Sequence, residues 1–443
     1  MRDILRCRRG SAAFATVIAL IPLIGMMALG GEAGSWYVTK QRAQNAADAA
    51  AYSGALRLAC SLGSLTCADT QSVDYRGKQF AAQNAFCNSG DTSYPGSICA
   101  ASLPSGISHT VAIASLTSWN GNTGNFVQAT VSRQQPAYLA AVLGLSTVNI
   151  AATAVAEVKN PKDVCALGLG RWPKGSALTI GGNVTTAGNG CGLMSNDTVK
   201  FSSTPTITGS GWQIDAAKGC LPNVTQCNSL SVPYNYFMPA ATNPLQALDT
   251  ASFNSWTGKT TKLSCSGTLT PNNSTNLYGD LTCTNGDTVV FSPGTYFFYN
   301  ATITINGGTV SCPTCTGAGA SGVTLVLLGD SSISISGNAS VSLVAPSTNA
   351  TYPALAGVLI DDQAPNKSKN AVTVNGNSNM INLGGAMYFP NVDVAWSGTG
   401  VNANTTCSEV IANTLTMTGS AYMSTDGCVP ATVAHTQVVY LVQ

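Results

Sequence analysis

An uncharged apolar block near the start of the chain constrains its fold most strongly. Residues 12–31 contain no charged side chain. As an α-helix they would extend about 30 Å, which is the thickness of the hydrocarbon core of a bilayer. Four arginines lie within residues 2–9, whereas only Lys40 and Arg42 follow the block closely. Because positive charge is retained in the cytoplasm, the block predicts one transmembrane helix, with residues 1–11 as a cytoplasmic tail and the bulk of the chain on the other side.

Two alternatives compete with a retained membrane span. Small residues at positions 28–30 offer a place where a signal peptidase would cut, although the apolar region of a signal peptide is shorter, roughly 7–15 residues. A buried core helix has a similar composition but does not explain the flanking arginines or the unbroken apolar length. The retained span is the favoured interpretation.

The cysteines agree with export from the cytoplasm. The chain has 15 cysteines, of which Cys7 alone precedes the apolar block. The even number that follows the block predicts a disulfide framework in an oxidising compartment. The spacing favours four local pairs, namely Cys165–Cys191, Cys220–Cys227, Cys265–Cys283 and Cys407–Cys428. Two more bridges are expected, in an order left open, among Cys60, Cys67, Cys87 and Cys99.

A low content of charge narrows the class of protein. Charged residues make up 9% of the chain, compared with about a quarter in ordinary globular domains. The net charge of +1 gives no electrostatic basis for binding nucleic acid. The abundance of Gly, Ser, Thr and Asn in the second half fits long β structure whose turns use small polar residues.

A segment rich in small residues follows the apolar block. Alanine, glutamine and arginine favour a helix there, and the small residues recur at helical spacing: Ala43, Ala46, Ala47, Ala50, Ala51 and Gly54. Faces of small residues let helices approach closely. The pattern is explained equally by a juxtamembrane helix that continues the span and by a docking face for a partner helix.

The segment from Arg9 to Ala55 resembles the N-terminal segment of the TadG-like proteins of tight-adherence (Tad/Flp) pilus assembly. The resemblance rests on Gly10, Ala15, Pro22, Leu23, Glu32, Gly34, Gln44, Asp48, Ala49, Ala50 and Ala55. The chain departs from the family pattern at Ala43, where leucine is usual, and at Tyr52-Ser53, where Leu-Ala is usual. The resemblance implies association with pilus assembly and other pilus-assembly membrane proteins as partners. With the predicted span, it implies the bacterial inner membrane, with the bulk of the chain in the periplasm.

A cleaved, pilin-like N-terminus is a further alternative for this segment. The Gly10–Ser11 bond resembles a prepilin cleavage site. Pilins normally carry glutamate at the fifth mature position, where this chain has Ala15. The chain is also far larger than the small Flp pilin, which argues against a fibre subunit.

Residues 32–160 are predicted to form the TadG-like helix and a small α+β neck. The expected helices lie at 74–86 and 136–145, and the expected strands at 108–115, 124–134 and 146–159. Pro161 breaks the last strand, and charges cluster around it, which predicts a linker.

Residues 161–443 change to short alternating runs that end in glycine and asparagine. Equivalent glycines at Gly337, Gly376, Gly398 and Gly419 are 39, 22 and 21 residues apart. Such recurrence is typical of stacked coils, and small polar corners predict a right-handed parallel β-helix-like solenoid. A β-sandwich, which also has short strands and many turns, is the alternative. The fold class is therefore α+β with an all-β C-terminal part.

Two motifs with known chemistry have structural explanations here. Asp330, Ser332 and Ser334 have the spacing of a von Willebrand factor A metal site, but the sequence continues as a strand where that fold has a helix. Cys312 and Cys315 have redox spacing, but glycine-rich sequence follows in place of a helix, which favours a structural bridge. Neither a metal nor a cofactor is expected.

A paired carboxylate at Asp361 and Asp362 is the remaining candidate for catalysis. Carbohydrate-cleaving enzymes use two carboxyl groups that flank the scissile bond. Adjacent residues of a strand point to opposite faces, so these two do not converge unless the chain bends. His109 and His435 have alternating neighbours and are expected on strand surfaces rather than as bases.

The sequence as a whole favours a non-enzymatic scaffold or minor subunit of pilus assembly. Its extracytoplasmic part is expected to contact pilus proteins and peptidoglycan or outer-membrane components. A surface adhesin or carbohydrate-binding solenoid is the alternative from another class, and a β-helix carbohydrase using Asp361 and Asp362 is the third.

Overall fold

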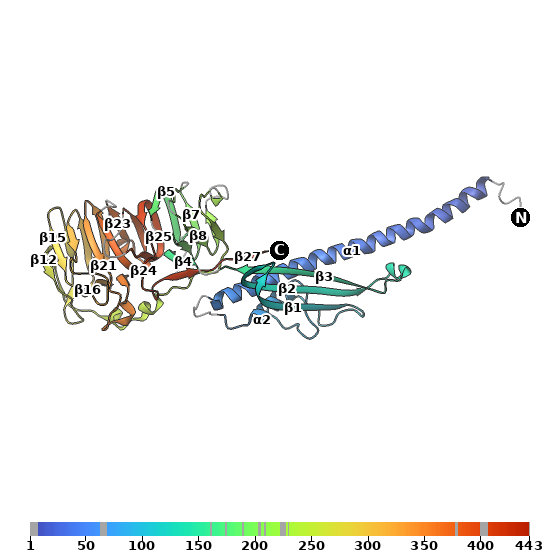
Figure 1. The fold of residues 1–443 in the computed structure, drawn as a ribbon, viewed down its shortest axis with the longest axis horizontal. Coiled ribbons are helices and arrows are strands. Elements are labelled where there is room, and N and C mark those ends of the chain that lie inside the picture. The colour runs from blue at the N-terminus through green and yellow to red at the C-terminus, as the bar shows by residue number, and fades with distance from the viewer. Residues whose placement is uncertain are drawn as a thin grey trace. The chain divides into compact units, whose positions relative to one another are not determined.

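A computed structural model defines the fold. It describes residues 8–62, 69–159, 162–172, 175–187, 190–202, 205–207, 210–221, 227–228, 230–376, 380–398 and 406–442. The chain forms two compact units (Figure 1). Unit 1 comprises Met1–Lys159 together with Val439–Gln443, and unit 2 comprises Asn160–Val438.

Unit 1 begins with α1 (Arg8–Leu62), one continuous helix of 55 residues that contains Pro22 without ending there (Figure 1). Within the described part of the chain, a single helix, starting at Ala15, is long and apolar enough to cross a membrane, with a mean hydropathy of 1.8. Leu23 and Met26 on this stretch are 53% and 67% exposed. Because an exposed apolar stretch of this length is unfavourable in water, it indicates a membrane anchor, and α1 continues from it directly into the rest of unit 1.

The C-terminal half of α1 packs on an antiparallel sheet. The strand order is β1 (Ser108–Trp119), β2 (Asn122–Pro136), β3 (Thr147–Val158) and β27 (Val439–Leu441). A second helix, α2 (Val73–Ala82), packs beside α1. The strand β27 lies within residues 161–443, which the sequence predicts as the C-terminal domain, yet it completes the sheet of unit 1.

The small-residue face of α1 is covered by the chain's own sheet. All five alanines of residues 43–51 that recur at helical spacing are fully buried, in a core shared with Val127 and Ala154. A Cβ added at Gly54 would lie 2.9 Å from Cγ1 of Val127, so the helix and the sheet approach too closely for a larger residue. The hypothesis that this face docks a partner helix is therefore wrong, because the face serves packing within unit 1.

The connection between β2 and β3 differs from the helix predicted at residues 136–145. Pro136 closes β2 instead of opening a helix. Only η1 (Ala140–Leu143), a single 3-10 turn, follows. Gly144 has φ 87°, a conformation that glycine adopts without steric cost, and it ends the turn at once. The chain then turns back into β3.

Unit 2 consists mainly of short strands that pair in parallel, in three rows (Figure 1). The first row contains β13 (Leu277–Tyr278), β16 (Gly294–Tyr299), β19 (Val323–Leu328) and β22 (Val358–Asp362). The second contains β14 (Leu281–Cys283), β17 (Thr302–Asn306), β20 (Ser332–Gly337) and β23 (Val372–Gly376). The third contains β12 (Ser266–Leu269), β15 (Thr288–Phe291), β18 (Thr309–Ser311) and β21 (Ser340–Val344). The long strand β24 (Ile381–Ser397) pairs with the last member of every row.

Branched apolar residues stack in register inside these rows. Ile303 of β17 pairs with Ile333 of β20, and Ile305 pairs with Ile335, and all four are buried. Parallel pairing does not fit the antiparallel sheets of an immunoglobulin-like sandwich. The β-sandwich alternative is therefore not supported.

The spatial order of the strands in unit 2 differs from their order along the chain. The first stack runs through β4 (Lys162–Gly168), β5 (Leu178–Ala187), β6 (Gly192–Ser195), β7 (Thr198–Phe201), β8 (Gln213–Ala216), β9 (Gly219–Leu221) and β10 (Tyr234–Tyr236). The chain then passes to β11 (Thr260–Thr261), at the far end of the three rows. It returns to β25 (Ser408–Tyr422), which pairs in parallel with both β4 and β5. The strand β26 (Ala434–Thr436) finally pairs antiparallel with β4.

The segment that crosses between the two ends, residues 237–259, covers apolar side chains of the first row. Two 3-10 turns shape it, η2 (Gln246–Thr250) and η3 (Ser252–Ser255). Phe253 and Trp256 pack on Phe297 of β16, with ring centroids 5.7 Å and 4.6 Å apart. The crossing segment thus contributes to the core of unit 2.

Disulfides hold both units. Within the described ranges the bonded pairs are Cys87–Cys99, Cys165–Cys191, Cys220–Cys227, Cys265–Cys283, Cys312–Cys315 and Cys407–Cys428. Cys60 is also disulfide-bonded, and Cys7 and Cys67 lie outside the described residues. All the described bridges follow the apolar block in sequence.

Candidate functional site

The strongest candidate site surrounds Glu32, which lies on α1 directly after the uncharged block. Its carboxylate accepts backbone N–H groups from Tyr138 at 2.7 Å, Leu139 at 3.0 Å and Ala140 at 2.8 Å. Desolvation acts to raise the pKa of Glu32, but the hydrogen bonds from Ala140, Tyr138 and Leu139 together lower it. The ionised carboxylate therefore fixes the β2–β3 connection to α1, since charge-assisted hydrogen bonds are the stronger kind.

The polar residues of the family motif tie α1 to β3. Gln44 Nε2 donates to Asp48 Oδ1 at 2.8 Å and lies 3.4 Å from the Thr153 carbonyl oxygen. Ala50 and Ala55 are fully buried in the core of unit 1. These residues hold α1 on the sheet, and the buried alanines are not accessible to a separate partner.

Most of the remaining motif residues are exposed and do not pack in the core of unit 1. Ala15, Pro22, Leu23 and Gly34 are exposed on α1, and Ala49 is half-buried. Gly10 lies in the same helix. An added Cβ at Gly34 meets nothing within 4 Å, so its small size is not required by packing inside unit 1.

The metal-site pattern at Asp330 is occupied by two lysines. Lys367 Nζ lies 2.9 Å and Lys369 Nζ 2.7 Å from the Asp330 carboxylate. Hydrogen bonds from Lys369 and Lys367 lower the pKa of Asp330 to about 2. Ser332 and Ser334 lie on β20, so the segment continues as a strand. The arrangement neutralises the carboxylate rather than presenting it to a cation.

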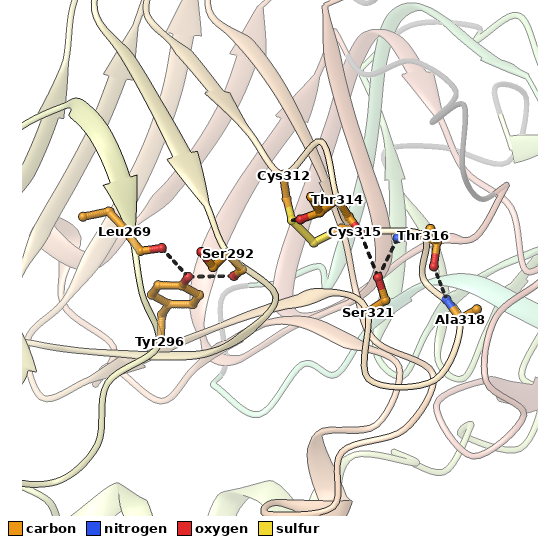
Figure 2. The surroundings of a disulfide bond; sticks show 9 residues. All are labelled: Leu269, Ser292, Tyr296, Cys312, Thr314, Cys315, Thr316, Ala318 and Ser321. Atoms are coloured by element: carbon orange, nitrogen blue, oxygen red, sulfur yellow. Dashed lines mark hydrogen bonds between the residues drawn. A yellow bond between two sulfur atoms is a disulfide. The ribbon is translucent and has the colours of Figure 1, made fainter.

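Cys312 and Cys315 form a disulfide across a turn (Figure 2). The Cys315 N–H donates to the Cys312 carbonyl oxygen at 3.0 Å, and both side chains are buried. The loop that follows is held by Ser321, whose Oγ donates to the Thr314 carbonyl oxygen at 2.9 Å (Figure 2). No helix begins in residues 311–322, all of which are described. Redox catalysis uses a reactive thiolate at the N-terminus of a helix. Residues 311–322 do not provide this arrangement.

Asp361 and Asp362 are both fully buried. Burial raises the pKa of Asp361 to about 7 and that of Asp362 well above its ordinary value. Gln363 donates to Asp361 at 2.7 Å, whereas the Ala364 N–H donates to Asp362 at 2.9 Å. The two carboxyls therefore have separate surroundings, and neither is open to a carbohydrate chain.

The two histidines lie on strands, as expected. His109 of β1 is 4.8 Å from the Phe86 ring, and burial followed by the charge of Arg133 lowers its pKa. His435 of β26 lies 3.0 Å from Asp163. Neither belongs to a nucleophile–base–acid arrangement among the described residues.

A buried glutamate beside a disulfide was missed by sequence reasoning. Glu409 of β25 is 1% exposed, and neither carboxylate oxygen has a hydrogen-bond partner among the described residues. Its ligand atoms lie within 4.8 Å of those of Cys407 and Cys428, but these sulfurs are joined to each other. Burial, with a smaller contribution from Asp163, raises the pKa of Glu409 to about 8, and the nearby Thr432 hydroxyl acts against this shift.

A second missed cluster fastens the crossing segment of unit 2. The Tyr388 hydroxyl donates to Asp249 Oδ1 at 2.6 Å, and Arg171 lies 2.5 Å from Asp249 Oδ2. Asn243 donates to the Tyr388 hydroxyl at 2.7 Å. Residues of this cluster are far apart in sequence, so no local spacing pointed to them.

The comparison with known families finds a match in the N-terminal segment. Residues 10–57 match the model of the Tad family, Flp pilus-assembly TadE/G-like. The N-terminal segment is TadE/G-like. The matched range contains Glu32, Gln44 and Asp48, and it covers the apolar part of α1 together with the part that packs on the sheet. No curated protein and no solved structure matches the chain.

The TadE/G-like segment indicates a role in Tad/Flp pilus assembly, among other components of that machinery. The long apolar helix in the same segment indicates a membrane anchor. The matched segment therefore lies on one continuous helix, whose apolar part indicates the anchor and whose C-terminal half packs in the core of unit 1.

Proposed function

We propose that the chain is a non-enzymatic, single-pass component of the bacterial inner membrane that acts as a periplasmic scaffold or minor subunit in Tad/Flp pilus assembly. The observation that carries this proposal is the family match on a helix that is exposed and apolar at one end and buried in unit 1 at the other. Partners are other pilus-assembly membrane proteins, with peptidoglycan or outer-membrane components beyond them.

The periplasmic location is supported by charge and by redox state. Arginines precede the apolar block, which by the positive-inside rule keeps the N-terminus in the cytoplasm. The disulfides described above all follow the block, and disulfides persist in oxidising compartments such as the periplasm.

Unit 2 serves this scaffold as a right-handed β-helix-like solenoid. Each strand of a row pairs in parallel with the strand three elements later, as expected if three strands make one coil. Stacked coils of this kind form long rigid surfaces that bind other macromolecules. Buried acids without a shared, open cleft support a binding role over a carbohydrase.

The test uses the pairing between β3 and β27. Val158 pairs with Val439 in an antiparallel ladder, so Lys159 and Val438 are the next residues of a hairpin. A variant in which Asn-Gly replaces residues 160–437 keeps every strand of unit 1, because Asn-Gly favours a two-residue hairpin. A deletion strain is complemented with the full chain or with this variant, and pili are counted by electron microscopy after immunoblots confirm equal membrane levels.

We expect pili with the full chain and none with the variant or the empty deletion strain. Pili restored by the variant would show that unit 2 is not part of the assembly scaffold, and loss of adhesion in that strain would favour an adhesin. Normal pili in the deletion strain itself would refute the pilus role.

A further inference from the structure

The β2–β3 connection is an apolar loop that unit 1 leaves uncovered. Tyr138, Leu139 and Leu145 are 75%, 44% and 48% exposed. Residues 134–156 contain no charged side chain. Large exposed apolar groups that cluster on one loop mark a contact surface rather than scattered surface residues.

The loop is held at one defined level of α1. Glu32 accepts three consecutive N–H groups of the loop, those of Tyr138, Leu139 and Ala140. Glu32 is also the first charged residue after the uncharged block of residues 12–31. The hydrogen bonds therefore place the loop at the height where the membrane-spanning part of α1 ends.

Several backbone N–H groups of the loop are hydrogen-bonded within unit 1. Ala137 donates to Ser146 at 3.1 Å, Gly144 to Ala141 at 3.0 Å and Leu145 to Ala140 at 3.2 Å. Together with Glu32, these bonds pair the N–H groups that a loop usually leaves to water. Each backbone polar group that is paired in this way lowers the cost of entry into a low-dielectric phase.

The neighbouring side chains suit a membrane–water boundary. A hollow of about 520 Å³ beside Glu32 is lined by Trp36, Arg42, Arg133 and Tyr138, among others. Aromatic rings gather at the headgroup level of bilayers, and long basic side chains reach lipid phosphates there.

We infer that the loop Ala137–Leu145 is a second membrane contact, which inserts the side chains of Tyr138, Leu139 and Leu145 among the phospholipids beside α1, with Glu32 as the residue that positions it. This inference rests on the proposed membrane anchorage of α1. The bilayer is its occupant because the loop continues the apolar surface of the spanning helix at the same level. Two contacts fix the tilt of unit 1 on the membrane, which one helix alone does not.

The test is lipid photo-crosslinking of the full chain in phospholipid nanodiscs. A photoreactive phenylalanine replaces Tyr138, Leu23 of the span or Ile98, which is 67% exposed in unit 1 but lies elsewhere. Lipid adducts are measured by mass spectrometry, in the wild-type background and with Glu32→Gln.

In the wild-type background we expect lipid adducts at positions 23 and 138 and several-fold fewer adducts at position 98. In the Glu32→Gln background we expect the adducts at position 138 to fall several-fold, whereas those at position 23 stay unchanged. Adducts at 23 without adducts at 138 would refute the inference while leaving the membrane anchor intact, as would crosslinks from 138 to a second copy of the chain. Absence of adducts at 23 would refute the anchor and the inference together. The pilus assay above is independent of either result.

Discussion

The Glu409→Gln substitution should make unit 2 less sensitive to rising pH. Glu409 is 1% exposed, and burial raises its pKa from 4.5 to about 8. Between these two values the folded chain keeps a proton that the unfolded chain releases, so the unfolded state binds fewer protons and stability falls as pH rises. The stabilisation is complete below the unfolded pKa and is lost as the pH approaches the folded pKa.

The size of the effect follows from the span of this window. Each pH unit inside it costs about 1.36 kcal/mol, so moving from about pH 5.5 to about pH 7.5 costs about 2.7 kcal/mol of unfolding free energy. For a unit of this size, that corresponds to a fall in Tm of about 5 °C. Glutamine has a similar shape and does not titrate, so the variant lacks this part of the pH dependence.

Thermal unfolding of the full chain in detergent, followed by tryptophan fluorescence, measures the effect. Trp396 is fully buried in unit 2 and reports on it. Asp361 and Asp362 respond to pH in the same direction but are present in both proteins, so they cancel in the comparison. Asp287→Asn is a control that should leave the pH dependence in this window unchanged. The backbone N–H and the hydroxyl of Thr284 lower the pKa of Asp287 from 3.8, so this group is ionised in both the folded and the unfolded chain at both pH values. Wild type and Glu409→Gln losing the same Tm between the two pH values would refute the reasoning.

Three further predictions test other features. Glu32→Gln should speed amide hydrogen exchange at residues 138–140 several-fold, with β1 unchanged; equal rates would show that the carboxylate does not hold the loop. Gly54→Val should destabilise unit 1 by about 1–3 kcal/mol through overpacking against Val127, measured by denaturant unfolding, whereas Gly34→Val, in open space, should cost far less. Cys165 and Cys191 are 26 residues apart, whereas Cys312 and Cys315 are 3 residues apart. Replacing the first pair by serine should therefore lower the unfolding free energy by about 2 kcal/mol more than replacing the second pair, because opening the longer loop gives the unfolded chain more entropy. Equal losses in Tm would contradict this.

The features that depend on local sequence patterns could be predicted. The apolar block, the alternating strands of residues 108–158 and the parallel pairing of unit 2 follow from periodicity, and the four guessed cysteine pairs are the ones that the structure joins. The helix predicted at residues 136–145 is wrong. Alanine and leucine in this range favour a helix, but Pro136 ends β2 and Gly144 ends the turn η1 within a few residues.

Contacts between distant segments were beyond sequence reasoning. The bonds of Glu32 join residues more than a hundred positions apart, and the Asp249–Tyr388 bond joins residues 139 positions apart. The small residues of α1 predict close packing, but they do not identify what packs on them. In the structure this is β2 and β3 of the same unit. The absence of charge in residues 134–156 is the local signal that could have pointed to the exposed loop.

The pairing of β27 with β3 also sets an order of events during biosynthesis. Unit 2 lies between these two strands in sequence, so the ribosome makes β27 only after the whole of unit 2. Until then β3 lacks its partner at residues 156–158, and an unpaired strand edge is a template for aggregation. A chain that stops before β27 therefore leaves the sheet of unit 1 incomplete, and degradation can remove it before it joins an assembly.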